Sequence, residues 1–175
     1  GFGTHNVQGL MNLFRWGLDN RIHVAVSSCG ADLRRGDRPD AEPLVLRGRN
    51  FSFDPRTLEA RAESGASQHG YFIDPLGREF TCNNSNHIEQ VLFPDRYLRR
   101  NPYFAVSGAI RTIAKEGPAA TVFRRSAPEP WRVVRTRMRV ADPKVRNALP
   151  FTEQFATGFF TSAAGVTIYR GSAYP

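Results

Sequence analysis

The densest cluster of hydrogen-bonding side chains in this sequence is the run Asn83-Asn84-Ser85-Asn86-His87. Neutral side-chain amides suit the hydroxyl groups of sugars, and amide carbonyl oxygens suit calcium. Runs of Asn and Ser also form ordinary turns, because their side chains bind the neighbouring backbone. The run is therefore either a ligand-binding loop or a turn between two strands.

The histidines are the candidate proton-transfer groups. An imidazole exchanges protons near neutral pH, so His5 could act as a general base, or it could be a loop residue near the start of the chain. His69 precedes Gly70 at the start of a predicted strand, where it could face a ligand or form a structural hydrogen bond. We expect His23 to lie on a strand face with a structural role.

Arginine carries nearly all of the positive charge. The net charge is +8, from 24 lysines and arginines against 16 acidic residues, and only Lys115 and Lys144 are lysines. This balance indicates either a solvated basic surface or an anionic partner such as phosphate, an acidic polysaccharide or nucleic acid. The chain has no aromatic-plus-basic motif of the kind that RNA-binding sheets carry, so we do not expect a nucleic-acid partner.

Residues 131–140 hold four of these arginines at close spacing. In the second half of the segment arginine alternates with Val, Thr and Met, which predicts a strand with one solvated face. The guanidinium groups could also clamp a carboxylate or a phosphate through forked hydrogen bonds. The arginines concerned are Arg132, Arg135, Arg137 and Arg139.

Composition limits the class of protein. A hydrophobic content of 41% over 175 residues supports a packed core in one domain or in part of a larger one. No apolar run approaches the roughly 20 residues that span a bilayer, and no leader is visible, although the absence of an initiator Met suggests a piece of a longer chain. Cys29 and Cys82 could be paired or free, and neither belongs to a haem-attachment or zinc motif.

Two segments, 14–26 and 68–93, share the pattern of strand, tight turn and strand. Apolar residues alternate through 22–26, and Pro and Gly in 74–77 favour a turn. The turn at 17–20 matches the turn at 74–77 with a constant offset of 57 residues. A propeller blade takes roughly 40–50 residues, so an offset of 57 fits one blade that carries one longer loop. We expect Asp19 and Asp74 to be turn residues rather than acids.

The remaining pattern favours an all-β protein. We expect a loop at 27–43, a helical turn within 94–102, and irregular structure or a brief helix at 108–116. We expect loop or weak helix at 141–158. Further strands are predicted at 44–46, 49–53, 58–62, 121–123, 131–140 and 159–170. The repeat predicts a single partial β-propeller domain over 1–175, incomplete at both ends, with long irregular loops and about three blades of a ring of about six. Residues outside the chain or a partner would then complete the ring, because open sheet edges are prone to pairing.

The amino-acid sequences of several segments resemble those of a large family of membrane-bound dehydrogenases. The segments that carry the resemblance are 14–20, 48–55, 82–86, 130–136 and 160–171, so it covers nearly the whole chain in order. Members of that family carry a propeller similar to that of soluble glucose and sorbosone quinoprotein dehydrogenases. A helical repeat region and a C-type haem domain often follow the propeller.

The resemblance implies a sugar or alcohol dehydrogenase that acts outside the cytoplasm and passes electrons to a separate haem domain. It implies pyrroloquinoline quinone (PQQ) and calcium as cofactors, with no haem motif within this chain and no metal ligand that can be named. His5 and His69 are its candidate catalytic residues. Its candidate cofactor-binding residues are Gln68, Asn83, Asn84, Asn86, His87, Arg15 and Arg170. The alternative is a non-catalytic propeller that binds carbohydrate or a protein, and a weaker third is a basic surface for anionic polymers.

Overall fold

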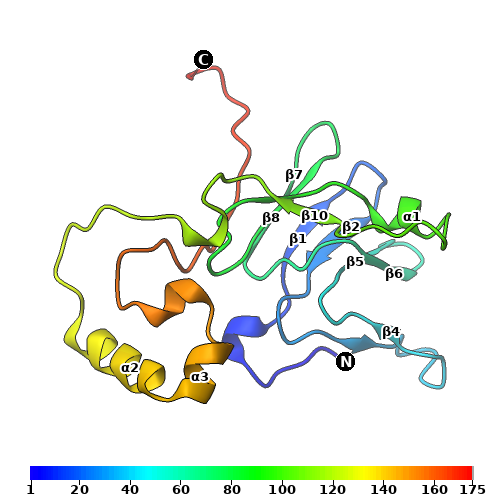
Figure 1. Ribbon diagram of the computed structural model, residues 1–175. Helices are drawn as coiled ribbons and strands as arrows, with labels where there is room; N and C mark the ends of the chain where they lie inside the picture. The colour runs from blue at the N-terminus through cyan, green and yellow to red at the C-terminus, as the bar shows by residue number, and fades with distance from the viewer. Residues whose placement is uncertain (175) are drawn as a thin grey trace.

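The computed structural model describes residues 1–174 and consists mostly of antiparallel β-sheet (Figure 1). The first four-stranded sheet has the order β1-β2-β5-β6. A short two-stranded hairpin, β3-β4, is inserted between β2 and β5. The strands are β1 (Asn12–Trp16), β2 (Ile22–Ala25), β3 (Asp32–Leu33), β4 (Leu44–Val45), β5 (Asn50–Phe53) and β6 (Ala60–Glu63).

The second four-stranded sheet is a continuous meander in the order β10-β9-β8-β7. Its strands are β7 (Gly70–Ile73), β8 (Glu79–Cys82), β9 (Glu89–Val91) and β10 (Ile110–Thr112). The short helix α1 (Asp95–Leu98) lies between β9 and β10. All the strand pairs in the three sheets are antiparallel. The prediction of an all-β protein is thus confirmed in its coarser part: residues 1–174 are mainly β, but they also include α-helices.

The turns at 17–21 and 74–78 are structurally equivalent, as the 57-residue offset predicts. In each turn the amide of the first residue donates to the carbonyl of the fifth, at 2.9 and 3.0 Å. The amide of the fourth residue donates to the carbonyl of the first, at 3.3 and 3.0 Å. The fourth residue has a positive φ in both, 59° at Asn20 and 77° at Gly77, a conformation that Asn and Gly tolerate best. The two hairpins are therefore copies of one unit.

The first strands of the two sheets, β1 and β7, lie side by side and join the sheets. The Asn12 amide donates to the Gln68 carbonyl at 2.8 Å, and the Arg15 guanidinium lies 5.5 Å from the centre of the Phe72 ring. Within the first sheet, the apolar core is formed by Val24, Val26, Ala31, Leu46, Phe51 and Ala62. Residues 23–26 are all buried, so both faces of β2 are covered rather than the single face that the alternation of 22–26 predicts.

Helices occur mainly after residue 116. They are η2 (Gly117–Ala119), α2 (Pro130–Ala141), α3 (Pro143–Ala148) and η3 (Phe151–Gln154), preceded near the N-terminus by η1 (Val7–Gly9). They form a lobe beside the sheets, in which α2 packs against α3 and η3 (Figure 1). Among residues 1–174, no helix is both long enough and apolar enough to cross a bilayer.

Several predicted elements are wrong. Residues 131–140 form helix α2 instead of a strand: Pro130 provides a good first helical residue, and Val133 and Val140 turn toward η3. Residues 110–112 form strand β10 rather than irregular structure or a helix. Residues 160–170 have no regular secondary structure, and the predicted strands at 121–123 and 159–170 reduce to a single bridge between Thr121 and Phe159.

Candidate functional site

A cavity of about 1050 Å³ opens between the helical lobe and the two sheets. One side comes from residues 12–13 at the start of β1, from 68–69 just before β7, and from the loop 83–86 after β8. The facing side comes from α2, and the segments 150–155 and 161–164 complete it. The repeat thus places the beginnings of both first strands and the polar loop at one site, although they are far apart in the sequence.

Arginines of α2 form one wall of this cavity. Arg132, Arg135 and Arg139 are three and four residues apart, so the helical period places all three on one face. Arg132 donates to Thr161 Oγ1 at 3.4 Å, and Arg139 pairs with Glu153 at 3.3 Å. Arg135 has no hydrogen-bond or ion-pair partner among residues 1–174. Because Glu153 is the single acidic residue in the lining, the cavity is electropositive and suits an anion.

The alternation in residues 134–140 predicts that these arginines lie on a strand, where alternate residues share a face. Period two would group Arg135, Arg137 and Arg139 and separate them from Arg132. In the helix Arg137 faces away from the cavity and lines a smaller hollow between α2 and η3. The spacing of residues 132, 135 and 139 is typical of one helix face, and Pro130 is typical of a helix start, so these two features together could have predicted the arginine wall.

The polar loop of residues 83–87 anchors the C-terminal part of the chain. The Asn84 side chain accepts from the Ser162 amide at 3.0 Å and donates to Glu153 Oε1 at 3.3 Å. The Ser85 hydroxyl lies 3.1 Å from that of buried Thr152. Asn83, Asn84, Ser85 and Asn86 all line the cavity, so the loop both supports the fold and presents polar atoms to the cavity.

Two cavity-lining amides keep a buried oxygen without a partner. The Oδ1 atoms of Asn12 and Asn86 have no hydrogen-bond donor among residues 1–174. Leaving such an acceptor unpaired costs about 1–3 kcal/mol, so a hydroxyl or amide donor would be favoured there. Asn12 is next to a bulge in β1, where Leu13 has a φ of 51°. Bulges of this kind redirect side chains at binding sites.

The other predicted site residues are divided between the cavity and more distant places. His69 and Gln68 line the cavity, and Gln68 Oε1 accepts from the Asn84 amide at 3.0 Å. His87 ends the polar loop and does not line the cavity; its ring is 5.2 Å from that of Phe160, and its buried Nδ1 is unpartnered in residues 1–174. His5 is exposed, and neither His5, Arg15 nor Arg170 lines the cavity.

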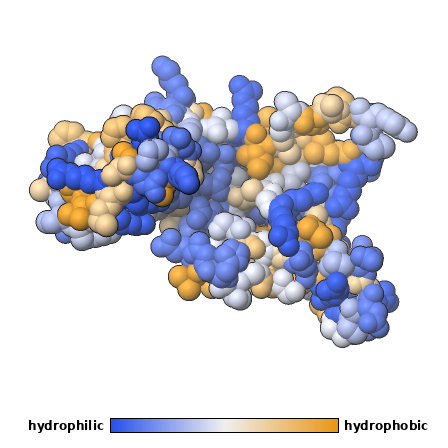
Figure 2. All heavy atoms as spheres, turned by 60° about the horizontal axis from the view of Figure 1, so that its bottom comes forward, coloured by the Kyte–Doolittle hydropathy of each residue, from blue (hydrophilic) through white to orange (hydrophobic). Residues whose placement is uncertain are grey.

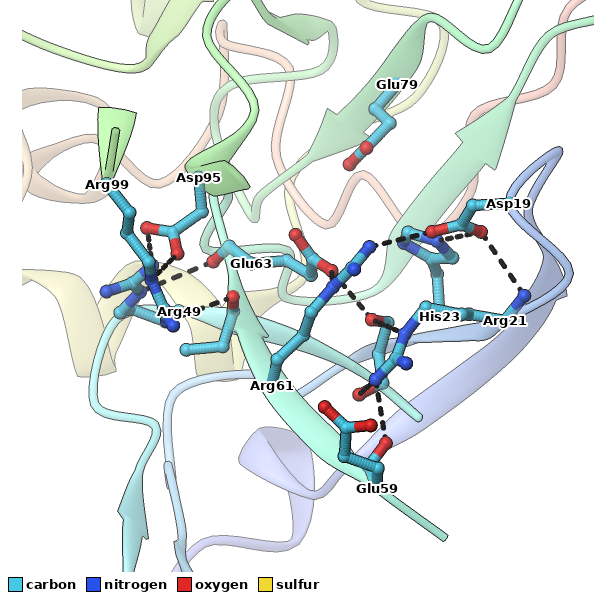
Figure 3. A network of polar contacts seen from close by, with 12 residues as sticks. Asp19, Arg21, His23, Arg49, Glu59, Arg61, Glu63, Glu79, Asp95 and Arg99 are labelled. Atoms are coloured by element: carbon cyan, nitrogen blue, oxygen red, sulfur yellow. Dashed lines mark hydrogen bonds and ion pairs between the residues drawn. The ribbon is translucent and has the colours of Figure 1, made fainter. Parts of the chain in front are cut away.

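A second polar network lies beside the turn at 17–21, where Asp19, His23 and Arg61 lie close together (Figure 3). A contact between His23 and Tyr71 extends it to the second sheet. His23 Nε2 is 3.0 Å from Asp19 Oδ1, and His23 Nδ1 is 3.3 Å from the Tyr71 hydroxyl. That hydroxyl donates to Glu79 Oε2 at 2.8 Å. Arg61 bridges Asp19 and Glu63, at 2.8 and 2.6 Å. Asp19 is therefore more than the turn residue that the sequence predicts.

Burial sets the ionisation of this network. Burial raises the pKa of Tyr71 well above its ordinary value, and the neighbouring Glu79 carboxylate raises it further. Burial also raises the pKa of Glu79, against the opposing hydrogen bond from Tyr71. At Asp19 burial acts in the same direction, but hydrogen bonds from His23 and Arg21 and the charge of Arg61 outweigh it, so its pKa is lowered. Tyr71 is only 1% exposed, which leaves it no access to a substrate.

The fold and the cavity define a mainly antiparallel β protein with a basic, amide-lined site at the start of its repeated hairpins. The chain belongs to the family described as domain of unknown function DUF7133, whose model matches residues 1–175. No curated protein and no solved structure matches the chain.

Proposed function

We propose that this chain is part of a β-propeller oxidoreductase whose cavity holds a quinone cofactor with several carboxylates. Two equivalent hairpins that begin four-stranded antiparallel sheets, with their first strands adjacent, support a partial propeller. The observation that carries the proposal is the wall of Arg132, Arg135 and Arg139 facing residues 68–69 and the loop 83–86. PQQ is a planar polycarboxylate, and arginine forks bind such carboxylates bidentately.

The cavity residues fit a quinone better than they fit calcium. A volume of about 1050 Å³ is large enough for a cofactor of this size together with a small substrate. Asn12 and Asn86 supply unpaired amide oxygens for donor groups of the ligand or substrate. Calcium prefers several carboxylate oxygens, whereas the lining offers only Glu153, which already pairs with Arg139.

When bound, the quinone would supply the acceptor for a hydride from an alcohol carbon. Within the chain, Arg135 would bind a carboxylate, and Arg132 and Arg139 would orient the ring plane. His69 would accept the proton of the substrate hydroxyl, because it is the one predicted catalytic histidine that lines the cavity. The substrate would be a sugar or another alcohol, and electrons would pass to a C-type haem domain outside the cytoplasm.

Dye reduction by the PQQ-reconstituted protein tests this proposal. A panel of sugars and alcohols should give reduction that requires both PQQ and substrate. His69→Asn should lower the rate by about 100-fold or more, since positioned acid–base catalysis contributes that much. The matched control His5→Asn should leave the rate unchanged, because His5 is exposed and away from the cavity. Absence of turnover with every substrate in the panel would refute the catalytic proposal.

The alternative is a non-catalytic site for carbohydrate, and one observation favours it. Trp131 lines the cavity and is 59% exposed, so its ring could stack on a sugar while the amides of the loop 83–86 bind hydroxyl groups. Under this alternative, sugars bind without any PQQ-dependent turnover. Trp131→Ala would then weaken sugar binding, whereas Arg135→Gln would leave it intact.

A further inference from the structure

Within the proposed anion site, the carboxylate of Glu153 lies where a ligand carboxylate would be expected. Glu153 Oε2 accepts from Arg139 at 3.3 Å, and Glu153 Oε1 accepts from the Asn84 side-chain amide at 3.3 Å. It therefore takes one donor from the arginine wall and one from the polar loop, which are the two sides of the cavity. A ligand that spans the cavity from the arginine wall to the polar loop would meet these same two donors.

Both of these contacts are long. Charge-assisted hydrogen bonds between a guanidinium and a carboxylate usually measure about 2.7–2.9 Å. The side chains of Arg139 and Glu153 are also 31% and 29% exposed, so solvent weakens their attraction. The pair is thus loosely held and can exchange at low cost.

The segment that carries Glu153 has a separate anchor. The neighbouring Thr152 is buried, and its hydroxyl lies 3.1 Å from that of Ser85. The helix η3 is four residues long and packs against α2 and η2. Displacement of the Glu153 side chain would therefore leave Thr152 and the backbone of η3 attached to the rest of the molecule.

We propose that Glu153 is an internal competitor that occupies the anion site until an anionic ligand displaces it from Arg139 and Asn84. This inference rests on the proposed anion site but not on redox chemistry. Glu153 sets the affinity of the cavity by neutralising one of its three arginines. A polycarboxylate reaches Arg132 and Arg135 as well and can displace Glu153, whereas a singly charged anion can bind Arg135 with Glu153 left in place.

Calorimetric titration with citrate, a small polycarboxylate, tests this inference. Glu153→Gln keeps the size of the side chain and an acceptor oxygen but removes the charge, so citrate should bind about fivefold more tightly or better. The matched control Glu129→Gln removes the same charge next to α2 and outside the cavity lining, and should change the affinity by less than about twofold. Acetate should show a smaller gain than citrate.

Hydrogen exchange supplies a second readout. Citrate should leave amide exchange in residues 151–155 nearly unchanged in both proteins, because the Thr152 contact holds η3 in place while only the Glu153 side chain moves. Faster exchange in these residues would mean that η3 itself is displaced and would overturn the inference. Unchanged or weaker citrate binding by a folded Glu153→Gln protein would overturn the inference, as would absence of citrate binding to both proteins. Failure of PQQ turnover alongside tighter citrate binding would refute the proposed function and leave the role of Glu153 supported.

Discussion

Tyr71→Phe should destabilise the protein through the junction between the two sheets. The Tyr71 hydroxyl is buried, donates to Glu79 Oε2 at 2.8 Å and lies 3.3 Å from His23 Nδ1. Its removal leaves the half-buried Glu79 carboxylate without this donor. A lost hydrogen bond to a charged group is worth about 1.5–3 kcal/mol, so we expect a loss of about 2–3 kcal/mol in the free energy of unfolding at pH 7.

The loss should depend on pH in a defined direction. The pKa of Glu79 is already raised in the folded protein, and without the Tyr71 hydroxyl it should rise further. The folded Tyr71→Phe protein then binds a proton at Glu79 more readily than the folded wild type does. Its loss in the free energy of unfolding, relative to wild type, is therefore largest above the raised pKa of Glu79 and becomes smaller as Glu79 is protonated. The double variant Tyr71→Phe with Glu79→Gln should lose this pH dependence, because no carboxyl remains at residue 79.

Urea unfolding followed by circular dichroism between pH 4 and pH 8 measures these effects. The control Tyr103→Phe removes a hydroxyl from a side chain that is 94% exposed, and should change stability by less than about 0.5 kcal/mol. A Tyr71→Phe deficit as small as that of the control would refute the reasoning. So would a deficit that stays constant over the whole pH range.

Two further predictions test the packing and the second network. Gly70→Ala would place a Cβ against the Cys82 thiol, and overpacking of this kind costs about 1–3 kcal/mol. Thermal unfolding should show this loss, while Gly108→Ala, which meets no atom closer than 3.7 Å, should lose far less. Asp19→Asn should destabilise the protein at neutral pH, because the lowered pKa of Asp19 reflects hydrogen bonds and charges that favour its ionised form. The difference from wild type should vanish in acid as the pH falls through that lowered pKa, and a difference that persists there would contradict it.

The hairpins could be predicted because their signals are local. Alternation in 22–26 and the turn chemistry of 74–77 determine strands and turns without knowledge of distant contacts. The offset between the two turns then predicts that the hairpins are equivalent, and their matching backbone hydrogen bonds confirm it.

The C-terminal part was harder because its sequence satisfies two periods at once. Residues 134–140 alternate like a strand, whereas 132, 135 and 139 share a helix face. Residues 159–170 have the composition of a strand, but a strand needs a neighbour, and within residues 1–174 only Phe159 has one. Tertiary contacts decided both segments.

The sequence predicts one side of the candidate site, the polar side, but not the side formed by the arginines. Residue type points to His69 and the loop 83–86, the family resemblance points to Gln68, and the structure brings all of them to one cavity. The sequence pattern places the arginines of the wall on a strand, whereas they lie on helix α2. No local pattern marks Glu153 as a site residue. Its position depends on the docking of η3 against the polar loop, which local sequence does not reveal.

The affinity of the wild-type protein for PQQ, compared with that of Arg135→Gln and Arg137→Gln, tests the central claim most directly. Both variants lose one positive charge from α2, but only Arg135 lines the large cavity. Loss of one charge-assisted hydrogen bond should weaken binding about tenfold or more in Arg135→Gln, while Arg137→Gln should stay within about twofold of wild type. Equal weakening in both variants, or no binding of PQQ to the wild-type protein, would contradict the assignment of this cavity as the cofactor site.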